Sequence, residues 1–449
     1  MKFILPIFLC LLSLEAEPLS LPHALDILRQ NNLELKIAEY DTQAASQTQD
    51  MAGAQHYGQL NFIQNAFRSN DAGNVFGYTL TSREATFGNF GFADFNPANP
   101  NILDVQPHDL NYPEDRNFFQ SKLVYELPLY TGNKITAYQE MAKEMKHISS
   151  LNEKQQLQEK IYELRKSFYN MGLLEDSLTN LNLILTNMGK LKHTTQNMID
   201  EGYAKKVDIL EVRSKEANVR RIITELEANK ELLYHYLSFL LNQDVKEIAA
   251  PKENLDTPTV SVDEILNQSI DIQKAQTALR IHKSKLTAEE SRYLPTIGAM
   301  AEIQTADDSF LGDANDHKSY TVGVQLKWNI FGGGGDSAAI EKAQIDRLKS
   351  QTQVELAKKG IALRIREIQT NIKLTNSQIE NLKIELSLAQ EIYKNYEGRY
   401  KEQLISMNDV IIKQSIWLEN ILQLLKANND RNQEIFALEK LAQLGDTHE

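Results

Sequence analysis

The sequence predicts a mostly α-helical chain that also contributes strands to a β-barrel, with this architecture occurring twice. Three observations predict it: an internal repeat, long apolar seams at helical spacing, and short segments that alternate apolar and polar residues. Only 20 glycines and 11 prolines occur in 449 residues, which favours long helices over compact α/β domains. The formal charge of −13 argues against a nucleic-acid partner, which would require a basic surface.

The chain repeats itself at a shift of 201 residues. Leu-Tyr-Thr-Gly at 129–132 recurs as Ile-Phe-Gly-Gly at 330–333. The same shift relates Val-Asp-Ile-Leu at 207–210 to Asn-Asp-Val-Ile at 408–411. A repeat of this length is too long for a solenoid and indicates one architecture made from two similar halves.

The halves differ in length because their starts match at a larger shift. Residues 20–25 correspond to 261–266, a shift of 241, so the first half carries about 40 extra residues before Leu129. The expected division is a first repeat over 17–249, a polar linker over 250–260 and a second repeat over 261–445.

The N-terminus reads as an export signal over 1–16. Lys2 is followed by an apolar run at 3–14 that is too short to span a bilayer as a helix, and cleavage is expected after Ala16. The only cysteine, Cys10, would leave with the signal, so neither a disulfide nor thiol chemistry is predicted. No later stretch reaches 18 consecutive apolar residues, so the exported chain would be periplasmic or an outer-membrane β-barrel.

Helices are predicted from apolar residues that recur at alternating steps of four and three. This 3.5-residue seam is clearest over 361–400 and recurs over 164–188, and it is typical of a coiled coil. Each long helix, at 1.5 Å per residue, would measure about 100 Å. The expected helices are 21–56, 133–199 and 206–242 in the first half, and 262–292, 336–400 and 407–444 in the second.

Four shorter segments alternate apolar and polar residues and predict strands of transmembrane length. They are 59–67, 119–129, 297–304 and 320–330, with aromatic residues near several of their ends. The extra residues of the first half fall in the loop 68–117 between its two strands, and the matching loop 306–319 is short. Four strands cannot close a barrel, and open edges in hydrocarbon are costly, whereas three chains would supply twelve strands around a lumen.

The strand-to-helix turns and the helical tips carry a resemblance to a known family. The turns contain Gly132 in the first half and Gly332 and Gly333 in the second. The helical tips of that family carry Tyr or Phe, then Gly, then Asp followed by aliphatic residues. In the first half, Gly202 and Asp208 match this pattern. In the second half, Tyr400 and Asp409 match it, and Gln403 replaces the Gly. Over essentially all of its mature length the chain resembles the TolC-like outer-membrane efflux proteins.

The resemblance implies a homotrimer with a twelve-stranded barrel in outer-membrane lipid and an α-helical tunnel in the Gram-negative periplasm. It also implies a periplasmic adaptor, expected to contact the tips at Gly202 and Gln403, and an inner-membrane pump that is proton-driven or ATP-driven. The family's second acidic residue and its basic locking residue align with Ile412 and Ile405. A gate that uses the same salt bridges is therefore not expected here.

Asp409, Asp208 and Tyr400 are the candidate gate residues. Three copies of either aspartate would form a carboxylate ring that attracts cations in a narrow aqueous mouth. The alternative is that each aspartate is only a negative charge that interacts favourably with the dipole at a helix N-terminus. We favour this alternative for Asp208 and the carboxylate ring for Asp409. Tyr400 could donate a closing hydrogen bond or simply end the apolar seam.

No motif predicts catalysis, a cofactor or a metal site. The glycine-rich run 331–336 lacks the Gly-Lys-Ser/Thr ending of a phosphate loop, and the acidic residues at 307–308 and 313–316 lack EF-hand spacing. His108-Asp109 is read as surface. The predicted function is a passive exit duct of a tripartite efflux or type I secretion system, gated at the periplasmic tips. The alternatives are an exported coiled-coil structural protein without a pore and, with no supporting motif, a hydrolytic barrel enzyme.

Overall fold

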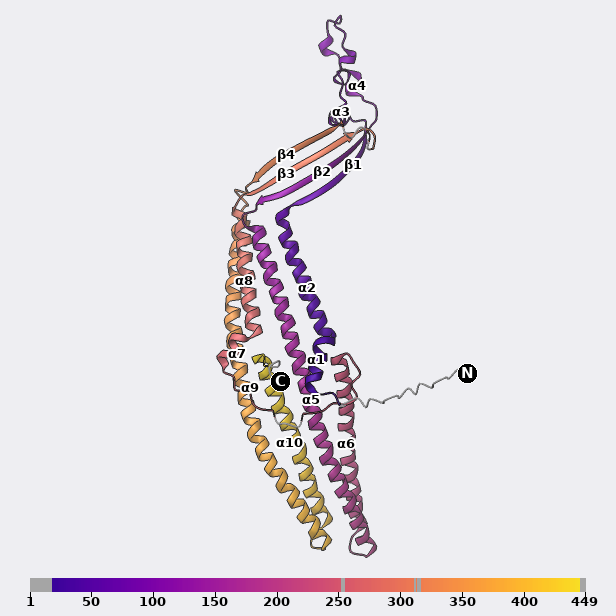
Figure 1. Cartoon of the computed structure of the whole chain (residues 1–449), viewed down its shortest axis with the longest axis vertical. Helices are drawn as coiled ribbons and strands as arrows, with labels where there is room; N and C mark the ends of the chain where they lie inside the picture. Colours follow the sequence, from indigo (N-terminus) through magenta and orange to yellow (C-terminus); the bar gives the residue numbers. More distant parts are fainter. Residues whose placement is uncertain (1–17, 252–254, 311, 313–315, 445–449) are drawn as a thin grey trace, which may run out of the picture. The chain divides into compact units, whose positions relative to one another are not determined.

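The computed structural model describes residues 18–251, 255–310, 312 and 316–444 (Figure 1). These residues form two compact units: a helical unit built from 18–43, 148–276 and 352–444, and a sheet unit built from 44–147 and 277–351. The predicted signal over 1–16, with Cys10 and the cleavage site after Ala16, lies outside the described residues.

The sheet unit contains one four-stranded antiparallel sheet in the order β1-β2-β3-β4. Its strands are β1 (Gln59–Ser69), β2 (Arg116–Tyr130), β3 (Thr296–Asp307) and β4 (Lys318–Lys327). All four predicted strands occur, and the pairing of β2 with β3 joins the two halves of the chain. The predicted end of the last strand at 330 is wrong, because β4 stops at Lys327 and the Trp328 indole then donates to the Tyr293 carbonyl, at 3.0 Å.

The two faces of the sheet differ in polarity, as the alternation predicts. Directly paired residues share a face, so the register places Leu60, Tyr125, Ala301 and Val322 in one row. The neighbouring row is Phe62, Leu123, Ile303 and Tyr320. Most side chains of these rows are exposed, and among them Val322 retains 73 % of its surface. The sheet therefore presents a broad apolar face that the described residues leave largely exposed.

The opposite face carries polar side chains that bond across three strands. The Asn65 amide donates to Gln120 Oε1 at 3.0 Å, and the Gln120 amide donates to Gln304 Oε1 at 2.7 Å. Lys122 lies 3.4 Å from Glu302. A cleft of about 890 Å³ opens between this face and the end of helix α2 (Leu33–Ala54), lined partly by Gln59, Glu126 and Met300.

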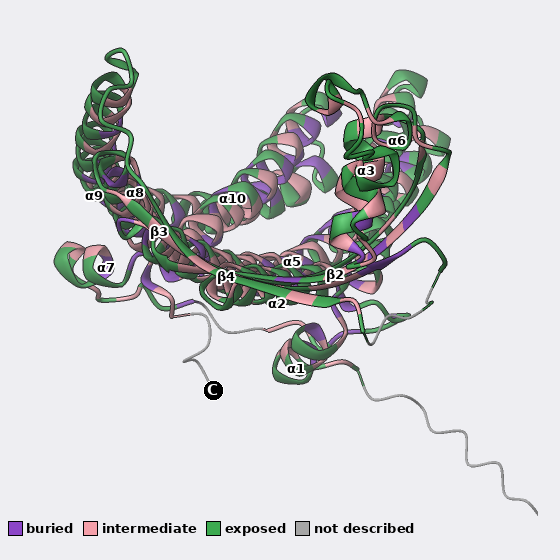
Figure 2. Cartoon of the chain, turned by 90° about the horizontal axis from the view of Figure 1, so that it is seen from above, coloured by how far each residue is buried: buried purple, intermediate pink, exposed green. Residues whose placement is uncertain are grey.

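The long helices match their predicted extents to within two residues. They are α5 (Lys134–Asp200), α6 (Lys206–Leu241), α9 (Gly335–Lys401) and α10 (Met407–Ala442), and α5 and α9 contribute to both units. Their buried residues form stripes along the helices (Figure 2). The predicted seams supply these stripes: Leu164, Met171, Ile365 and Ile368 are fully buried. Near the tips, a single apolar cluster takes residues from all four long helices.

The opening helix of each half is split, which the apolar pattern did not predict. The first half has α1 (Leu21–Asn31) and α2 (Leu33–Ala54), and the second has α7 (Val262–Gln268) and α8 (Ile270–Glu290). Asn32 accepts from the Leu35 amide at 2.9 Å and donates to the Leu240 carbonyl at 2.7 Å. Ser269 accepts from the Ile272 amide at 3.4 Å. Each break is therefore a buried polar residue that caps the helix after it.

The loop between β1 and β2 is folded. It contains α3 (Ala72–Thr81), α4 (His108–Asn111) and three 3-10 turns, η2 (Gly88–Phe90), η3 (Phe92–Asp94) and η4 (Ile102–Asp104). Two further 3-10 turns, η1 (Gln55–Tyr57) and η5 (Ser291–Tyr293), lead into β1 and β3. None of the helices in the described ranges combines the length and apolar composition needed to cross a membrane.

Candidate functional site

The two helical tips have the same backbone geometry although their sequences differ. Gly202 ends α5 with φ +82°, and Gln403 ends α9 with φ +61°. At the first tip the Tyr203 amide donates to the Met198 carbonyl at 2.7 Å, and at the second the Leu404 amide donates to the Arg399 carbonyl at 2.9 Å. The Gly202 amide also donates to the Ile199 carbonyl, and the Gln403 amide donates to the Tyr400 carbonyl. The two hydrogen bonds at each tip form a Schellman motif, in which the left-handed position is normally glycine.

Replacing Gln403 with glycine should stabilise the second tip. The left-handed conformation costs a residue with a Cβ roughly 1–2 kcal/mol relative to glycine. Glycine has more conformational freedom in the unfolded chain, which offsets part of this difference. We therefore expect the free energy of unfolding of the tip to rise by about 1 kcal/mol. The measurement is amide hydrogen exchange over residues 399–410, which should be slower in Gln403→Gly than in the wild-type protein. Gln403→Ala is the matched control, since it keeps the Cβ; equal protection in both variants would contradict the explanation.

Asp409 caps the helix that leaves the second tip. Ser406 donates to Asp409 Oδ2 through its backbone amide at 3.1 Å and its hydroxyl at 2.6 Å, and the Asp409 amide donates back to Ser406 Oγ at 3.3 Å. This is a complete capping box. The two bonds from Ser406 hold the pKa of the Asp409 carboxyl below its usual range.

Asp208 occupies the equivalent position at the first tip. Its Oδ2 accepts from the Lys205 amide at 2.9 Å, without a hydroxyl partner. Both aspartates therefore accept hydrogen bonds at the N-terminus of the helix that leaves their tip. This does not exclude the ring, because both carboxylates remain partly exposed.

Tyr400 lies in the apolar cluster of the tips and is 4 % exposed. Burial raises the pKa of its phenol; the nearby Thr195 hydroxyl opposes this shift, and the Asp208 carboxylate adds to it. The structure thus brings Tyr400 near Asp208 of the other hairpin. Within the described ranges the Tyr400 hydroxyl has no well-aligned hydrogen-bond partner. Of the two residues that replace the family's locking charges, Ile405 packs on the cluster and Ile412 is exposed.

The two strand-to-helix turns correspond at the shift of 201. Gly132 and Gly333 both adopt φ +63°. A Cβ on Gly132 would also lie 2.9 Å from the Leu294 Cβ, so both conformation and space require glycine there. Gly332 also lies between β4 and α9, but its φ is not among the positive values of the described glycines, so the left-handed positions of this turn are Gly333 and Gly334.

The residue after each of these glycines, Asn133 or Gly334, is also left-handed, which was not predicted from the sequence. Asn133 adopts φ +69° and Gly334 adopts φ +83°. Asn is the non-glycine residue best suited to that region, and aligning the repeats at a shift of 201 would have identified the pair.

The sheet edges complete the site. In the described part of the chain, β1 pairs only with β2, and β4 pairs only with β3, so each leaves one side of its backbone unpaired. A sheet with one apolar face, one polar face and two open edges, continued by long amphipathic hairpins, has the features of one subunit of an outer-membrane channel.

The comparisons with known proteins agree with that class. Residues 261–443 match the sequence model of the outer membrane efflux protein family. The structure resembles CusC, with a TM-score of 0.78 and 16 % identity over 94 % of this chain and 91 % of that one. It also resembles the CmeC outer membrane channel of Campylobacter jejuni, with a TM-score of 0.76 and 14 % identity over 96 % of this chain and 87 % of that one.

A third match is VceC of Vibrio cholerae, with a TM-score of 0.78 and 14 % identity over 94 % of this chain and 95 % of that one. No curated protein sequence matches the chain. The second repeat therefore matches the outer membrane efflux protein family, and nearly the whole chain has the fold of these solved outer-membrane channels. The predicted fold class is thereby confirmed, and the family matched by the second repeat is one of outer-membrane proteins, in agreement with the predicted location. The family consists of transport channels rather than enzymes, and they work with adaptors and inner-membrane pumps.

Proposed function

We propose that three copies of this chain form a passive exit duct across the outer membrane, serving a tripartite efflux or type I secretion system. The observation that supports this most strongly is the sheet with two open edges. Its outer face is apolar over rows such as Leu60, Tyr125, Ala301 and Val322, and its other face is hydrogen-bonded through Gln120. In this proposal the apolar face contacts lipid and the polar face lines water.

The open edges favour closure by other copies of the chain. Each unpaired backbone group in hydrocarbon costs several kcal/mol, so an isolated four-stranded sheet would not remain in a bilayer. Joining β1 of one copy to β4 of the next satisfies both edges, and three copies give twelve strands, enough to leave a lumen. The long hairpins would continue the lumen as a helical tunnel.

The tips would serve as the gate and as the contact for a periplasmic adaptor. Tyr203 and Leu404, which follow Gly202 and Gln403 in the chain, expose most of their apolar surface. Exposed apolar side chains at the ends of rigid hairpins favour docking of another protein. The adaptor would link the duct to an inner-membrane pump, and the duct itself would hydrolyse nothing and require no cofactor.

Recording of single channels in planar bilayers tests this function. The wild-type protein is expected to give small, cation-selective openings, because three copies each of Asp208 and Asp409 concentrate negative charge at the mouth. Asp409→Asn should enlarge the openings and reduce cation selectivity, since the amide keeps an acceptor for Ser406 but loses the charge.

Glu402→Gln is the matched control, as it removes an exposed tip carboxylate that caps no helix and should change conductance little. Anion-selective openings would contradict the acidic ring. A protein that forms no channel and stays soluble after export would support the rival structural coiled-coil protein.

A further inference from the structure

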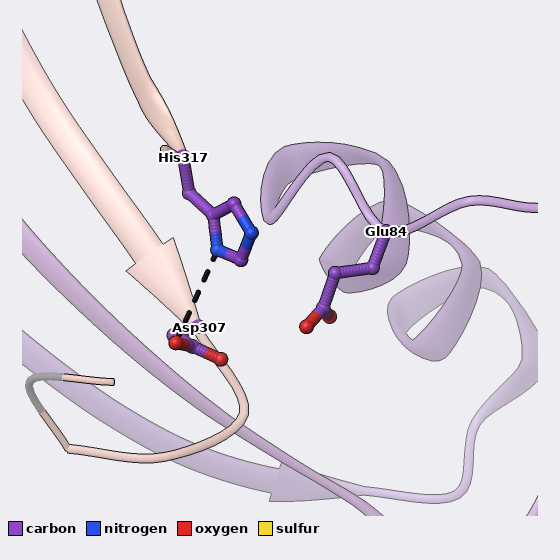
Figure 3. A group of neighbouring side chains, drawn as sticks. All are labelled: Glu84, Asp307 and His317. Carbon is purple, nitrogen blue, oxygen red and sulfur yellow. Dashed lines mark ion pairs between the residues drawn. The ribbon is translucent and has the colours of Figure 1, made fainter. Parts of the chain in front are cut away.

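Three side chains of metal-ligating type converge at the end of the sheet where the long β1–β2 loop meets the β3–β4 hairpin. Glu84 follows α3 in the loop, Asp307 is the last residue of β3, and His317 immediately precedes β4. One ligand atom from each of the three lies within 4.8 Å of the other two (Figure 3). They come from three segments and both repeats, so the fold rather than the local sequence brings them together.

Two of these side chains are nearly enclosed. Asp307 and His317 expose 10 % and 13 % of their side chains. His317 Nδ1 lies 4.0 Å from Asp307 Oδ2, which is too long for a direct hydrogen bond between the two side chains. Burying a carboxylate beside an imidazole is costly unless a cation or hydrogen-bond donors compensate.

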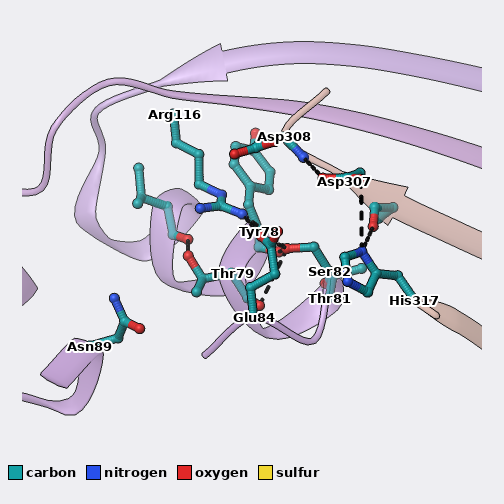
Figure 4. Close-up of polar contacts among 12 residues, drawn as sticks. Tyr78, Thr79, Thr81, Ser82, Glu84, Asn89, Arg116, Asp307, Asp308 and His317 are labelled. Carbon is teal, nitrogen blue, oxygen red and sulfur yellow. Dashed lines mark hydrogen bonds and ion pairs between the residues drawn. The ribbon is translucent and has the colours of Figure 1, made fainter. Parts of the chain in front are cut away.

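The surrounding bonds hold each group in place (Figure 4). The His317 ring contacts the Ala306 carbonyl through Nδ1 at 3.2 Å; with the proton there, Nε2 keeps its lone pair for an ion. The Asp308 amide donates to Asp307 Oδ1 at 2.6 Å. Ser82 and Arg116 both donate to Glu84 Oε2, and no bond to Oε1 occurs among the described residues.

Arg116 is a cation already present beside the cluster. Its guanidinium pairs with Glu84, and Asp307 is followed directly in the chain by a second carboxylate, Asp308. Held by Arg116 and Ser82 on one oxygen, Glu84 would offer the other oxygen to an ion, an outer-shell arrangement common at metal sites.

We propose that Glu84, Asp307 and His317 bind a divalent transition-metal ion, of which Zn²⁺ is the best probe. One imidazole and two carboxylates suit Zn²⁺ with a water as fourth ligand, while Ca²⁺ would require six to eight oxygen ligands. The ion would fasten the long loop of the first repeat to the hairpin of the second.

The test is titration of the untagged full-length protein in detergent, stripped with a chelator, with Zn²⁺ by calorimetry and with Co²⁺ by visible absorption. Wild-type protein should bind one ion per chain. His317→Ala should weaken binding by at least about tenfold, the lower end of the loss seen even for outer-shell residues. Glu84→Gln should weaken it as well, and its partial exposure makes misfolding less of a concern.

His108→Ala is the matched control, because His108 is a histidine of the long loop whose side chain is exposed and lies beside the exposed Asp109 carboxylate. It should bind as the wild type does. Absence of Zn²⁺ binding by the wild-type protein, or equal affinity in the His317 and His108 variants, would overturn the proposal. Because this experiment measures only ion binding, its result is independent of whether the protein forms channels in the bilayer recordings.

Discussion

Replacing Val322 with lysine is expected to prevent the protein from assembling in the outer membrane. Val322 lies near the middle of β4 on the apolar face, in the row with Leu60, Tyr125 and Ala301. A lysine facing lipid near the bilayer midplane costs about 2–4 kcal/mol, and a trimer would carry three of them. Membrane fractionation after expression, and urea titration of protein refolded into liposomes, measure the effect.

Thr321→Lys is the control for this prediction. Thr321 is the adjacent residue of the same strand on the opposite face, paired with Glu302. A lysine there would face water and an existing carboxylate, so assembly should proceed. If both lysine variants insert equally well, the apolar face does not contact lipid, and the assignment of the two faces is wrong.

Replacing Glu439 with leucine is expected to destabilise the helical unit by about 3–5 kcal/mol. Glu439 of α10 and Arg165 of α5 form an ion pair at 2.7 Å whose side chains are only 5 % and 8 % exposed. The guanidinium also lies 5.3 Å from the centre of the Phe436 ring. Removing the carboxylate leaves a buried charge without its partner. The midpoint of urea unfolding, followed by circular dichroism, should fall.

Two further variants separate charge from packing. The double variant Arg165→Met with Glu439→Leu should recover most of the lost stability, because no buried charge remains. Glu225→Leu breaks the exposed pair of Arg221 and Glu225 and should change the midpoint little. If the double variant is as unstable as Glu439→Leu, the loss of stability comes mainly from altered side-chain packing and not from the unpaired buried charge.

The elements that follow a simple period could be predicted from the sequence. The seams through Ile365 and Ile368 and the alternation through Tyr320 and Val322 reappear as the buried stripe and the apolar face. Breaks such as Asn32 could not be predicted, because the apolar pattern continues across them and only the contact with Leu240 shows why the helix stops.

The site could be predicted where the repeat identifies it. Asp208 and Asp409 correspond at a shift of 201, and both cap the helices that leave the tips. Gln403 was expected only as a departure from the family's glycine, yet the chain keeps the left-handed turn and tolerates the strain. The group of Glu84, Asp307 and His317 could not be predicted, because its members are far apart in sequence and meet only through the sheet and its loops.

Cross-linking between the two open edges tests the central claim most directly. The predicted mature protein contains no cysteine, so Ile63→Cys in β1 can be combined in turn with Thr321→Cys, Gly323→Cys or Gln325→Cys in β4, all on the polar face. A short bis-maleimide applied to outer membranes should give a covalent trimer with at least one pair, and no trimer with any single cysteine. Monomer alone from every pair, in protein confirmed to be in the outer membrane, would contradict a barrel closed by β1 and β4 of neighbouring copies.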